Sequence, residues 1–193
     1  PASLGRIDVV EIEPRVVDLN DLVSASLKLL RRLIGEDIEL EWRPGASLWP
    51  VRIDPSQIDQ VLANLCVNAR DAIGGAGRIR IGTSQRHVDA EEVAVHPDRA
   101  EGEYVVLTVA DSGRGMDAET MAHLFEPFFT TKPLGQGTGL GLSSVYGAVT
   151  QNGGFIVVES APGQGAAFAV HLPRANAAIS ARRSRPRPWP CWR

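Results

Sequence analysis

The chain has 193 residues, of which 44% are hydrophobic and 22% charged, a composition typical of one folded domain with a sizeable core. No apolar run reaches the ~18 residues that a membrane span needs, and no basic start precedes an apolar stretch, so we expect neither a span nor a signal peptide. The formal net charge is -3, but residues 174–193 carry six arginines and no acid, so the body is acidic and nucleic acid is not the expected partner.

The first half of the chain shows alternating helical and strand patterns. Asp54 supplies an N-cap carboxylate and Pro55 occupies the first helical position, which predicts a helix that ends at Gly74. Residues 1–16 are expected to be a linker with a short extended piece. The predicted elements that follow are a helix at 18–35, strands at 38–42 and 48–53, and the helix at 54–74.

The second half of the chain contains most of the predicted sheet. The polar segment 89–102 is interpreted as a surface connection, and from residue 174 onward proline and arginine replace the hydrophobic residues, which predicts a disordered tail at 174–193. The domain proper is therefore expected at 17–173. The predicted elements are strands at 78–88, 103–110, 155–160 and 166–172 and a helix that begins at 142. Together they predict an α+β fold, a two-layer sandwich whose mixed sheet is covered by helices on one face.

Three polar side chains interrupt the apolar helix predicted at 54–74. Asn64, Asn68 and Asp71 are spaced four and three residues apart, so they share one face of the helix. Their oxygens are hard ligands of the kind that Mg²⁺ prefers. A solvated helix face is the alternative, but two asparagines in a helix interior carry a propensity cost that favours a functional reason.

Two further motifs follow the strand predicted at 103–110. The sequence D-S-G-R-G at 111–115 places Asp111 at a strand end, where it could accept a hydrogen bond from a ligand amino group while bare glycine backbone lies against a flat ring. Residues 125–132 then bring three phenylalanines close to Lys132. Taken alone, a simple Asp-Gly turn, a hydrophobic loop and a solvated lysine are equally acceptable interpretations.

Residues 135–142 read G-Q-G-T-G-L-G-L and precede a helical pattern. Glycine at every second position removes Cβ atoms, so backbone N–H groups can approach a bulky anion at the start of the helix, where the dipole favours phosphate. A flexible linker is the alternative on glycine spacing alone. A dinucleotide-binding oxidoreductase is set aside because these glycines come late in the chain and only Glu159 lies near the required acid position.

In this order, the four motifs resemble the catalytic, ATP-binding domain of sensor histidine kinases, in the superfamily shared with gyrase, Hsp90 and the MutL repair proteins. The stretches N-L-C-V-N-A-R-D-A-I, D-S-G-R-G-M, F-E-P-F-F-T-T-K and G-T-G-L-G-L-S-S-V-Y-G are similar to the PAS-linked and hybrid kinases, and the likeness covers roughly residues 17–172. The resemblance implies a Bergerat-type sandwich, ATP and Mg²⁺ as cofactors, a mobile lid that begins at 125–132 and a phosphate cradle at 137–141.

The resemblance also implies roles for single residues. Asn68 matches the Mg²⁺ ligand, Asp111 matches the acceptor of the adenine amino group, and Asn64, Asn68 and Lys132 are the expected catalytic residues. The expected ATP-binding residues are Asn68, Asp71, Asp111, Gly113, Gly115, Thr131, Lys132, Gly137, Thr138, Gly139, Leu140 and Gly141.

Two departures from the family pattern bear on the reaction. Relatives that hydrolyse ATP carry a glutamate at the position of Asn64, and an amide cannot act as a general base, so ATP is expected to be kept for transfer. Ala166 stands where threonine is usual, which removes a hydroxyl contact near adenine worth about 1 kcal/mol.

No histidine of the chain fits the family's phosphoacceptor pattern of a histidine followed by an acid; the four are His87, His96, His123 and His171. We therefore expect the acceptor on a separate dimerisation hairpin, a response regulator downstream, and membrane contact only through segments outside this chain. The cysteines, Cys66 and Cys191, show no disulfide or metal spacing, which suits a reducing cytoplasmic setting. The alternative within the superfamily is a nucleotide-sensing regulatory module or an anti-sigma-type Ser/Thr kinase.

Overall fold

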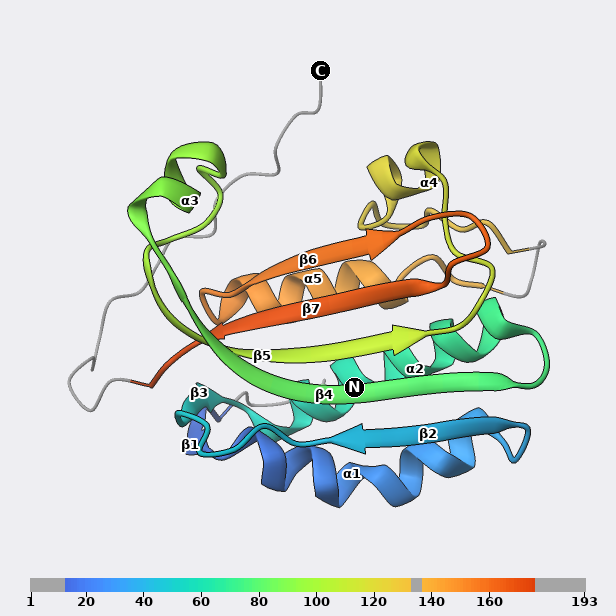
Figure 1. Cartoon of the computed structure of the whole chain (residues 1–193), viewed down its shortest axis with the longest axis horizontal. Helices are drawn as coiled ribbons and strands as arrows, with labels where there is room; N and C mark the ends of the chain where they lie inside the picture. The colour runs from blue at the N-terminus through green and yellow to red at the C-terminus, as the bar shows by residue number, and fades with distance from the viewer. Residues whose placement is uncertain (1–12, 133–136, 176–193) are drawn as a thin grey trace, which may run out of the picture.

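The computed structural model describes residues 13–132 and 137–175, which form a large sheet, a small sheet and a layer of helices (Figure 1). The strands are β1 (Arg15–Val17), β2 (Ile38–Arg43), β3 (Val51–Ile53), β4 (Gly77–Val88), β5 (Gly102–Asp111), β6 (Phe155–Ser160) and β7 (Ala166–Pro173). The helices are α1 (Leu19–Ile34), α2 (Pro55–Ile73), α3 (Ala90–Val95), α4 (Ala118–His123) and α5 (Gly141–Gln151).

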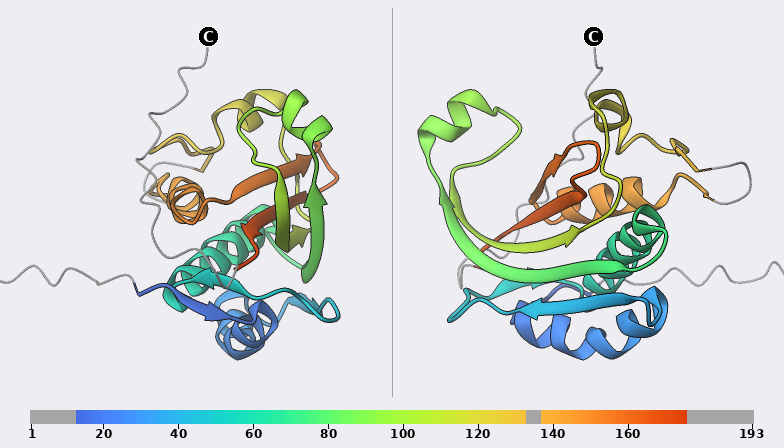
Figure 2. Two further views of the ribbon diagram at one scale, coloured as in Figure 1. Left: turned by 90° about the vertical axis from the view of Figure 1, so that its left-hand side faces the viewer. Right: turned by 45° about the vertical axis from the view of Figure 1, so that its right-hand side comes forward.

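The large sheet is mixed and has the strand order β2-β4-β5-β7-β6. Strand β2 runs parallel to β4, and the other neighbouring pairs are antiparallel. Helices α1, α2 and α5 cover one face of this sheet (Figure 2), and β1 pairs with β3 in the small sheet. The α+β sandwich with helices on one face is therefore confirmed.

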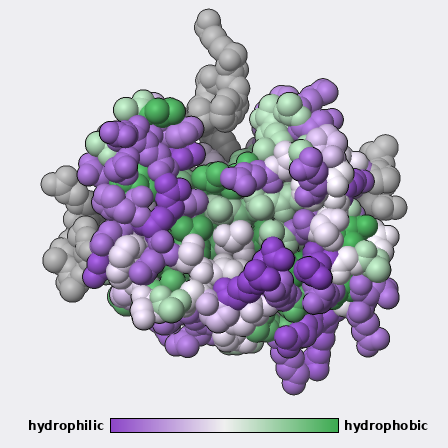
Figure 3. Space-filling model, in the orientation of Figure 1, coloured by the Kyte–Doolittle hydropathy of each residue, from purple (hydrophilic) through white to green (hydrophobic). Residues whose placement is uncertain are grey.

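The other face of the large sheet is hydrophilic where β2 and β4 lie side by side (Figure 3). Ion pairs join the two strands there, from Arg78 to Glu39 at 2.9 Å and from Arg80 to Glu41 at 2.9 Å. This alternation of charged and buried residues in β2 agrees with the expected strand pattern, because one side of the strand faces water and the other packs against the main hydrophobic core.

Helix α2 is the centre of the core, and its ends are set by local chemistry. The carboxylate of Asp54 accepts a hydrogen bond from the backbone N–H of Ser56, Pro55 opens the helix, and Gly74 ends it in the left-handed conformation at φ 67°. Its apolar side packs Leu62 and Leu65 into the main cluster of buried residues beneath the sheet. The opposite side of the helix is thereby left to face the cavity described below.

The structure contains two short helices that the sequence pattern does not predict. Helix α3 lies in the segment interpreted as a connection, and α4 follows the glycines at 113 and 115; each has six residues. Each begins after an aspartate, Asp89 or Asp117, whose side chain accepts a hydrogen bond from the N–H three residues later. A helix of fewer than two turns is too short to show a helical repeat of apolar residues. The capping aspartates are therefore the only sequence signal for these two helices.

Contacts at the two ends of the domain extend beyond the boundaries expected at 17 and 173. Strand β1 begins at Arg15, and the backbone N–H of Glu13 donates to the Asp54 carboxylate at 2.8 Å. At the other end, Arg174 bridges to Val51 and donates to Glu103 at 2.7 Å. The rest of the expected linker and tail, residues 1–12 and 176–193, lies outside the described residues. In the described part, no helix has the length and apolarity needed to cross a membrane.

His171 on β7 predicts a pH-dependent loss of stability. Its ring stacks on Phe155 at 4.2 Å between centroids, and its exposed fraction is only 2%. Burial, reinforced by the positive charges of Arg86 and Arg99, lowers the pKa of His171 from 6.5 to about 4. The unfolded chain takes up this proton at a higher pH than the folded chain does. The contribution of the neutral ring to the free energy of unfolding is therefore fully present above pH 6.5, and roughly 3 kcal/mol of that free energy is lost as the pH falls towards 4.

Urea unfolding between pH 7 and 4 measures this loss. The variant H171F keeps an aromatic ring in the stack, and its unfolding free energy should depend less on pH over that range than that of the wild type. H96Q, at an exposed histidine, is the control variant, and its unfolding is followed over the same pH range. Identical slopes for H171F and the wild type would contradict the prediction.

Candidate functional site

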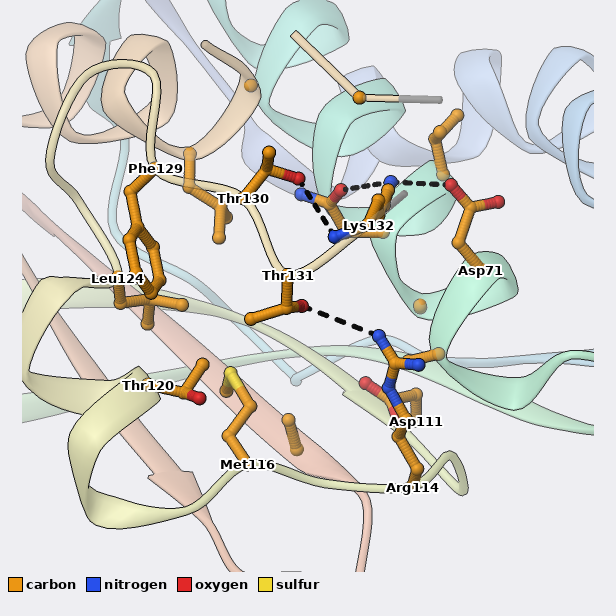
Figure 4. Close-up of a pocket in the computed structure, with 18 of the residues that line it drawn as sticks. Asp71, Asp111, Arg114, Met116, Thr120, Leu124, Phe129, Thr130, Thr131 and Lys132 are labelled. Atoms are coloured by element: carbon orange, nitrogen blue, oxygen red, sulfur yellow. Dashed lines mark hydrogen bonds and ion pairs between the residues drawn. The ribbon is translucent and has the colours of Figure 1, made fainter. Parts of the chain in front are cut away.

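A cavity of about 910 Å³ lies between the polar side of α2, the end of β5 and the segment from α4 to Lys132 (Figure 4). It collects residues from three distant parts of the chain into one wall. The expected site residues that line it are Asn64, Asn68, Asp71, Asp111, Gly115, Thr131, Lys132, Gly137, Thr138, Gly139 and Gly141.

One end of the cavity is formed by the polar face of α2. The ammonium of Lys132 donates to Asp71 Oδ2 at 2.6 Å and lies 3.4 Å from Asn68 Oδ1. Gly141 at the start of α5 lies on the other side, so close that a Cβ there would be 3.5 Å from Asn64 Oδ1. Asn68 and Asp71 therefore face the lysine, and Asn64 and Asn68 face the start of α5.

Asp71 is held by a second cation from its own helix. Arg70 donates to Asp71 Oδ1 from Nε at 3.0 Å and from Nη2 at 2.8 Å, and its Nη1 donates to the carbonyl of Leu33 at 2.8 Å. Burial raises the pKa of Asp71, but the hydrogen bonds and positive charges of Lys132 and Arg70 together lower it below its ordinary value. Asp71 is therefore a carboxylate at neutral pH.

This end of the cavity fits a small hard cation. Asn68 and Asp71 present oxygens on one helix face, and the ammonium of Lys132 already lies against both, so the position attracts positive charge. Among the described residues, no group of three or more His, Cys, Asp or Glu side chains could hold a metal. One or two protein oxygens with the remaining ligands from water and phosphate is the usual arrangement for Mg²⁺.

The other end of the cavity is formed by Asp111, at the end of β5. Its Oδ1 accepts the backbone N–H of Gly113 at 2.8 Å, and the backbone N–H of Ala166 also donates to the carboxylate. Burial raises the pKa of Asp111 above its ordinary value despite these two hydrogen bonds, which lower it. The carboxylate is thus oriented by backbone and retains accepting capacity towards the cavity.

The glycines after Asp111 allow close backbone contacts. Gly115 has φ +66°, and a Cβ there would overlap the carbonyl oxygen of Ala161. Gly113 is buried, and a Cβ on it would lie 2.7 Å from the carbonyl carbon of Ala72. Gly113 therefore supports the site from beneath and does not line the cavity, whereas Gly115 does.

Two other expected residues do not belong to the described cavity wall. Leu140 is 40% exposed and does not line the cavity, and Gly135 lies outside the described residues. Sequence reasoning assigned no role to several further lining residues, although all of them fall inside or beside the recognised motifs. They include Arg70, Arg114, Met116, Asp117, Thr120 and Leu124, whereas Phe129 and Thr130 belong to the lid segment expected at 125–132.

Comparisons with known proteins show which family the chain is similar to. Residues 53–176 match the family model described as "Histidine kinase-, DNA gyrase B-, and HSP90-like ATPase". The chain is 47% identical over 165 residues to the sensor kinase CckA of Brucella abortus, covering 84% of this chain and 17% of CckA. It also superposes on the solved mycobacterial sensor histidine kinase MprB with a TM-score of 0.65, 26% identity and coverage of 84% of this chain and 98% of the other.

A further solved structure contains a nucleotide analogue. Full-length ShkA in complex with AMPPNP matches with a TM-score of 0.68 and 29% identity, covering 88% of this chain and 33% of ShkA. This chain thus spans only a sixth to a third of these longer kinases.

Proposed function

The chain belongs to the histidine kinase-, DNA gyrase B- and HSP90-like ATPase family, as the ATP-binding catalytic domain of a two-component sensor histidine kinase, and from this premise we propose how it works. It binds ATP with Mg²⁺ in the cavity and transfers the γ-phosphoryl group to a histidine on a dimerisation hairpin. The observation that carries this proposal is the placement of the α2 oxygens and Asp111 at the two ends of one cavity.

The end of the cavity at α2 is suited to the metal and the terminal phosphates. Asn68 and Asp71 would hold the Mg²⁺ that the family uses, and Mg²⁺ neutralises charge on the transferred phosphoryl group. Asn64 lies beside them and, as an amide, can donate to a phosphate oxygen but cannot activate water. Asn64 and Asn68 thereby favour positioning of ATP over its hydrolysis.

The phosphates are expected to lie at the N-terminus of α5. This helix of eleven residues has no side-chain cap, so its first N–H groups remain available to an anion, and the helix dipole points the same way. Gly137, Thr138 and Gly139 lead into it and line the same wall. From the other side, the ammonium of Lys132 and the hydroxyl of Thr131 are expected to contact the phosphates.

The adenine ring is expected at Asp111. Its carboxylate is fixed by the N–H groups of Gly113 and Ala166, which leaves accepting capacity for the exocyclic amino group of the base. Gly115 keeps this part of the wall free of side chain, so a flat ring can lie against backbone. A cavity of about 910 Å³ is within the range of small-molecule sites.

A partner surface adjoins the cavity. Phe128 is 74% exposed and Leu140 is 40% exposed, and the backbone N–H of Phe128 donates to the carbonyl of Gly139 at 2.9 Å, so the two apolar side chains belong to neighbouring segments. Such a pair suits contact with a helical hairpin that brings its histidine to the phosphate. A response regulator would then accept the phosphoryl group from that histidine, in the cytoplasm, where ATP is supplied.

Phosphoryl transfer from γ-labelled ATP tests the proposal. The purified chain with Mg²⁺ should bind ATP and turn it over slowly when alone. Mixed with the dimerisation hairpin of the parent kinase, it should place an acid-labile label on the hairpin. A hairpin whose acceptor histidine is replaced provides the control and should remain unlabelled.

Two results would contradict the kinase assignment. Rapid release of labelled phosphate without any hairpin would indicate an ATPase. An acid-stable label on serine or threonine of a partner would indicate the anti-sigma type of kinase instead.

A further inference from the structure

Arg114 is the arginine of the D-S-G-R-G motif, and sequence reasoning assigned it no role. It lines the cavity and extends from the Asp111 end towards Thr131, whose hydroxyl lies 3.5 Å from Arg114 Nη2 (Figure 4). The side chain is exposed, so its guanidinium remains hydrated and free to change partners at little cost. Its donors therefore face the middle of the cavity.

The backbone of Arg114 is held from both sides. Its N–H donates to the carbonyl of Ala72 at the end of α2 at 3.1 Å, and its carbonyl accepts the N–H of Gly163 at 2.6 Å. The flanking Gly113 and Gly115 are confined by neighbouring backbone atoms and have no room for a Cβ. Within 113–115, residue 114 alone can therefore present a side chain to the cavity.

The other two cations of the cavity wall already pair with a carboxylate. Arg70 and Lys132 both pair with Asp71. Within the described part of the chain, Arg114 forms no ion pair, and its side chain contacts the neutral hydroxyl of Thr131. Arg114 is thus the described cation of this wall whose charge is not neutralised by a carboxylate.

We propose that Arg114 binds the phosphate chain of the nucleotide and makes the site selective for nucleotides over nucleosides. The inference rests on the proposed ATP-binding function and deepens it. A triphosphate with one bound Mg²⁺ remains anionic, and a guanidinium can donate two parallel hydrogen bonds to a phosphate. The Asp111 end already has an acceptor for the base, and Arg114 points from there towards the expected phosphate contact Thr131.

Equilibrium binding of ATP, ADP and adenosine to the whole chain tests this role. In R114Q, the affinity for ATP and ADP should fall about 10-fold or more, because a charge-assisted hydrogen bond is lost, while the affinity for adenosine stays the same. R114K should recover part of the loss, since it keeps the charge but not the two parallel donors. The salt dependence of ATP binding should also weaken in R114Q.

The control variant is R43Q, in which an exposed arginine outside the cavity loses its pairing with Glu41. It should bind all three ligands like the wild type, and thermal unfolding of each variant verifies the fold. An equal loss for adenosine would show that Arg114 stacks on the base, and an unchanged ATP affinity in R114Q would show that it contacts no phosphate; either result overturns the inference. If the wild type binds none of the three ligands, the proposed function itself fails.

Discussion

Replacing Asn68 with alanine is expected to reduce phosphoryl transfer to the hairpin by at least ~100-fold. The side chain supplies an oxygen at the cation position, beside the ammonium of Lys132 at 3.4 Å. Loss of one preorganised electrostatic contact to the reacting phosphate commonly costs two to three orders of magnitude in rate. The affinity for ATP in the absence of Mg²⁺ should change much less, because the adenine end at Asp111 is untouched.

The measurement is single-turnover transfer of labelled phosphate, with ATP binding followed separately with and without Mg²⁺. Q60A is the matched control, because Gln60 lies on the same helix but is exposed and does not line the cavity. It should transfer phosphate like the wild type. Undiminished labelling by N68A would remove Asn68 from the mechanism.

Replacing Asp111 with asparagine is expected to weaken ATP binding by about 100-fold. The backbone N–H groups of Gly113 and Ala166 both donate to the carboxylate, so they will orient the oxygen of an introduced amide towards themselves. The amide NH₂ would then face the adenine amino group, and two donors would meet. Leaving polar groups unsatisfied in this way costs roughly 1–3 kcal/mol for each group.

The same carboxylate predicts a pH dependence of binding. Burial raises the pKa of Asp111, so the accepting, ionised form is lost as the pH falls through that raised value. The ligand also titrates, so the useful quantity is the ratio of wild-type to D111N affinity, which should decrease towards acidic pH. D98N, at an exposed acid outside the cavity, should follow the wild type, and a ratio independent of pH would contradict the assignment.

The burial that raises the pKa of Asp111 also lowers the stability of the fold. Because the folded chain holds this proton more tightly than the unfolded chain, the ionised carboxylate lowers the unfolding free energy at neutral pH. D111N should therefore bind ATP poorly yet unfold no more easily than the wild type.

The main elements could be predicted because their signals are local. Asp54, Pro55 and Gly74 mark both ends of α2, and alternation of apolar and charged residues marks β2. Helices α3 and α4 are too short to show a period, and β3 is three residues long because only Val51–Ile53 pair with β1. Their formation depends on side-chain caps and on pairing with distant residues.

The candidate site was predictable to the extent that its residues share a motif or a helix face. The spacing of Asn64, Asn68 and Asp71 is sufficient to place them together. The pairing of Lys132 with Asp71 joins residues 61 positions apart and depends on the path of the chain after α4. Likewise, only the packing around Gly113 and Gly115 shows that neither position has room for a side chain.

The thiol of Cys66 gives this domain a built-in probe of its own opening. It lies on α2 between Asn64 and Asn68, is fully buried, and has its pKa raised to about 12 by burial. A thiol reagent needs the exposed thiolate, so modification of Cys66 requires α2 to separate from the sheet. In a chain whose other cysteine, Cys191, is replaced by serine, the labelling rate therefore measures the fraction of opened molecules. A ligand bound by the polar face of α2 would lower the labelling rate of Cys66 in proportion to its occupancy. The labelling rate would therefore report how much ligand is bound.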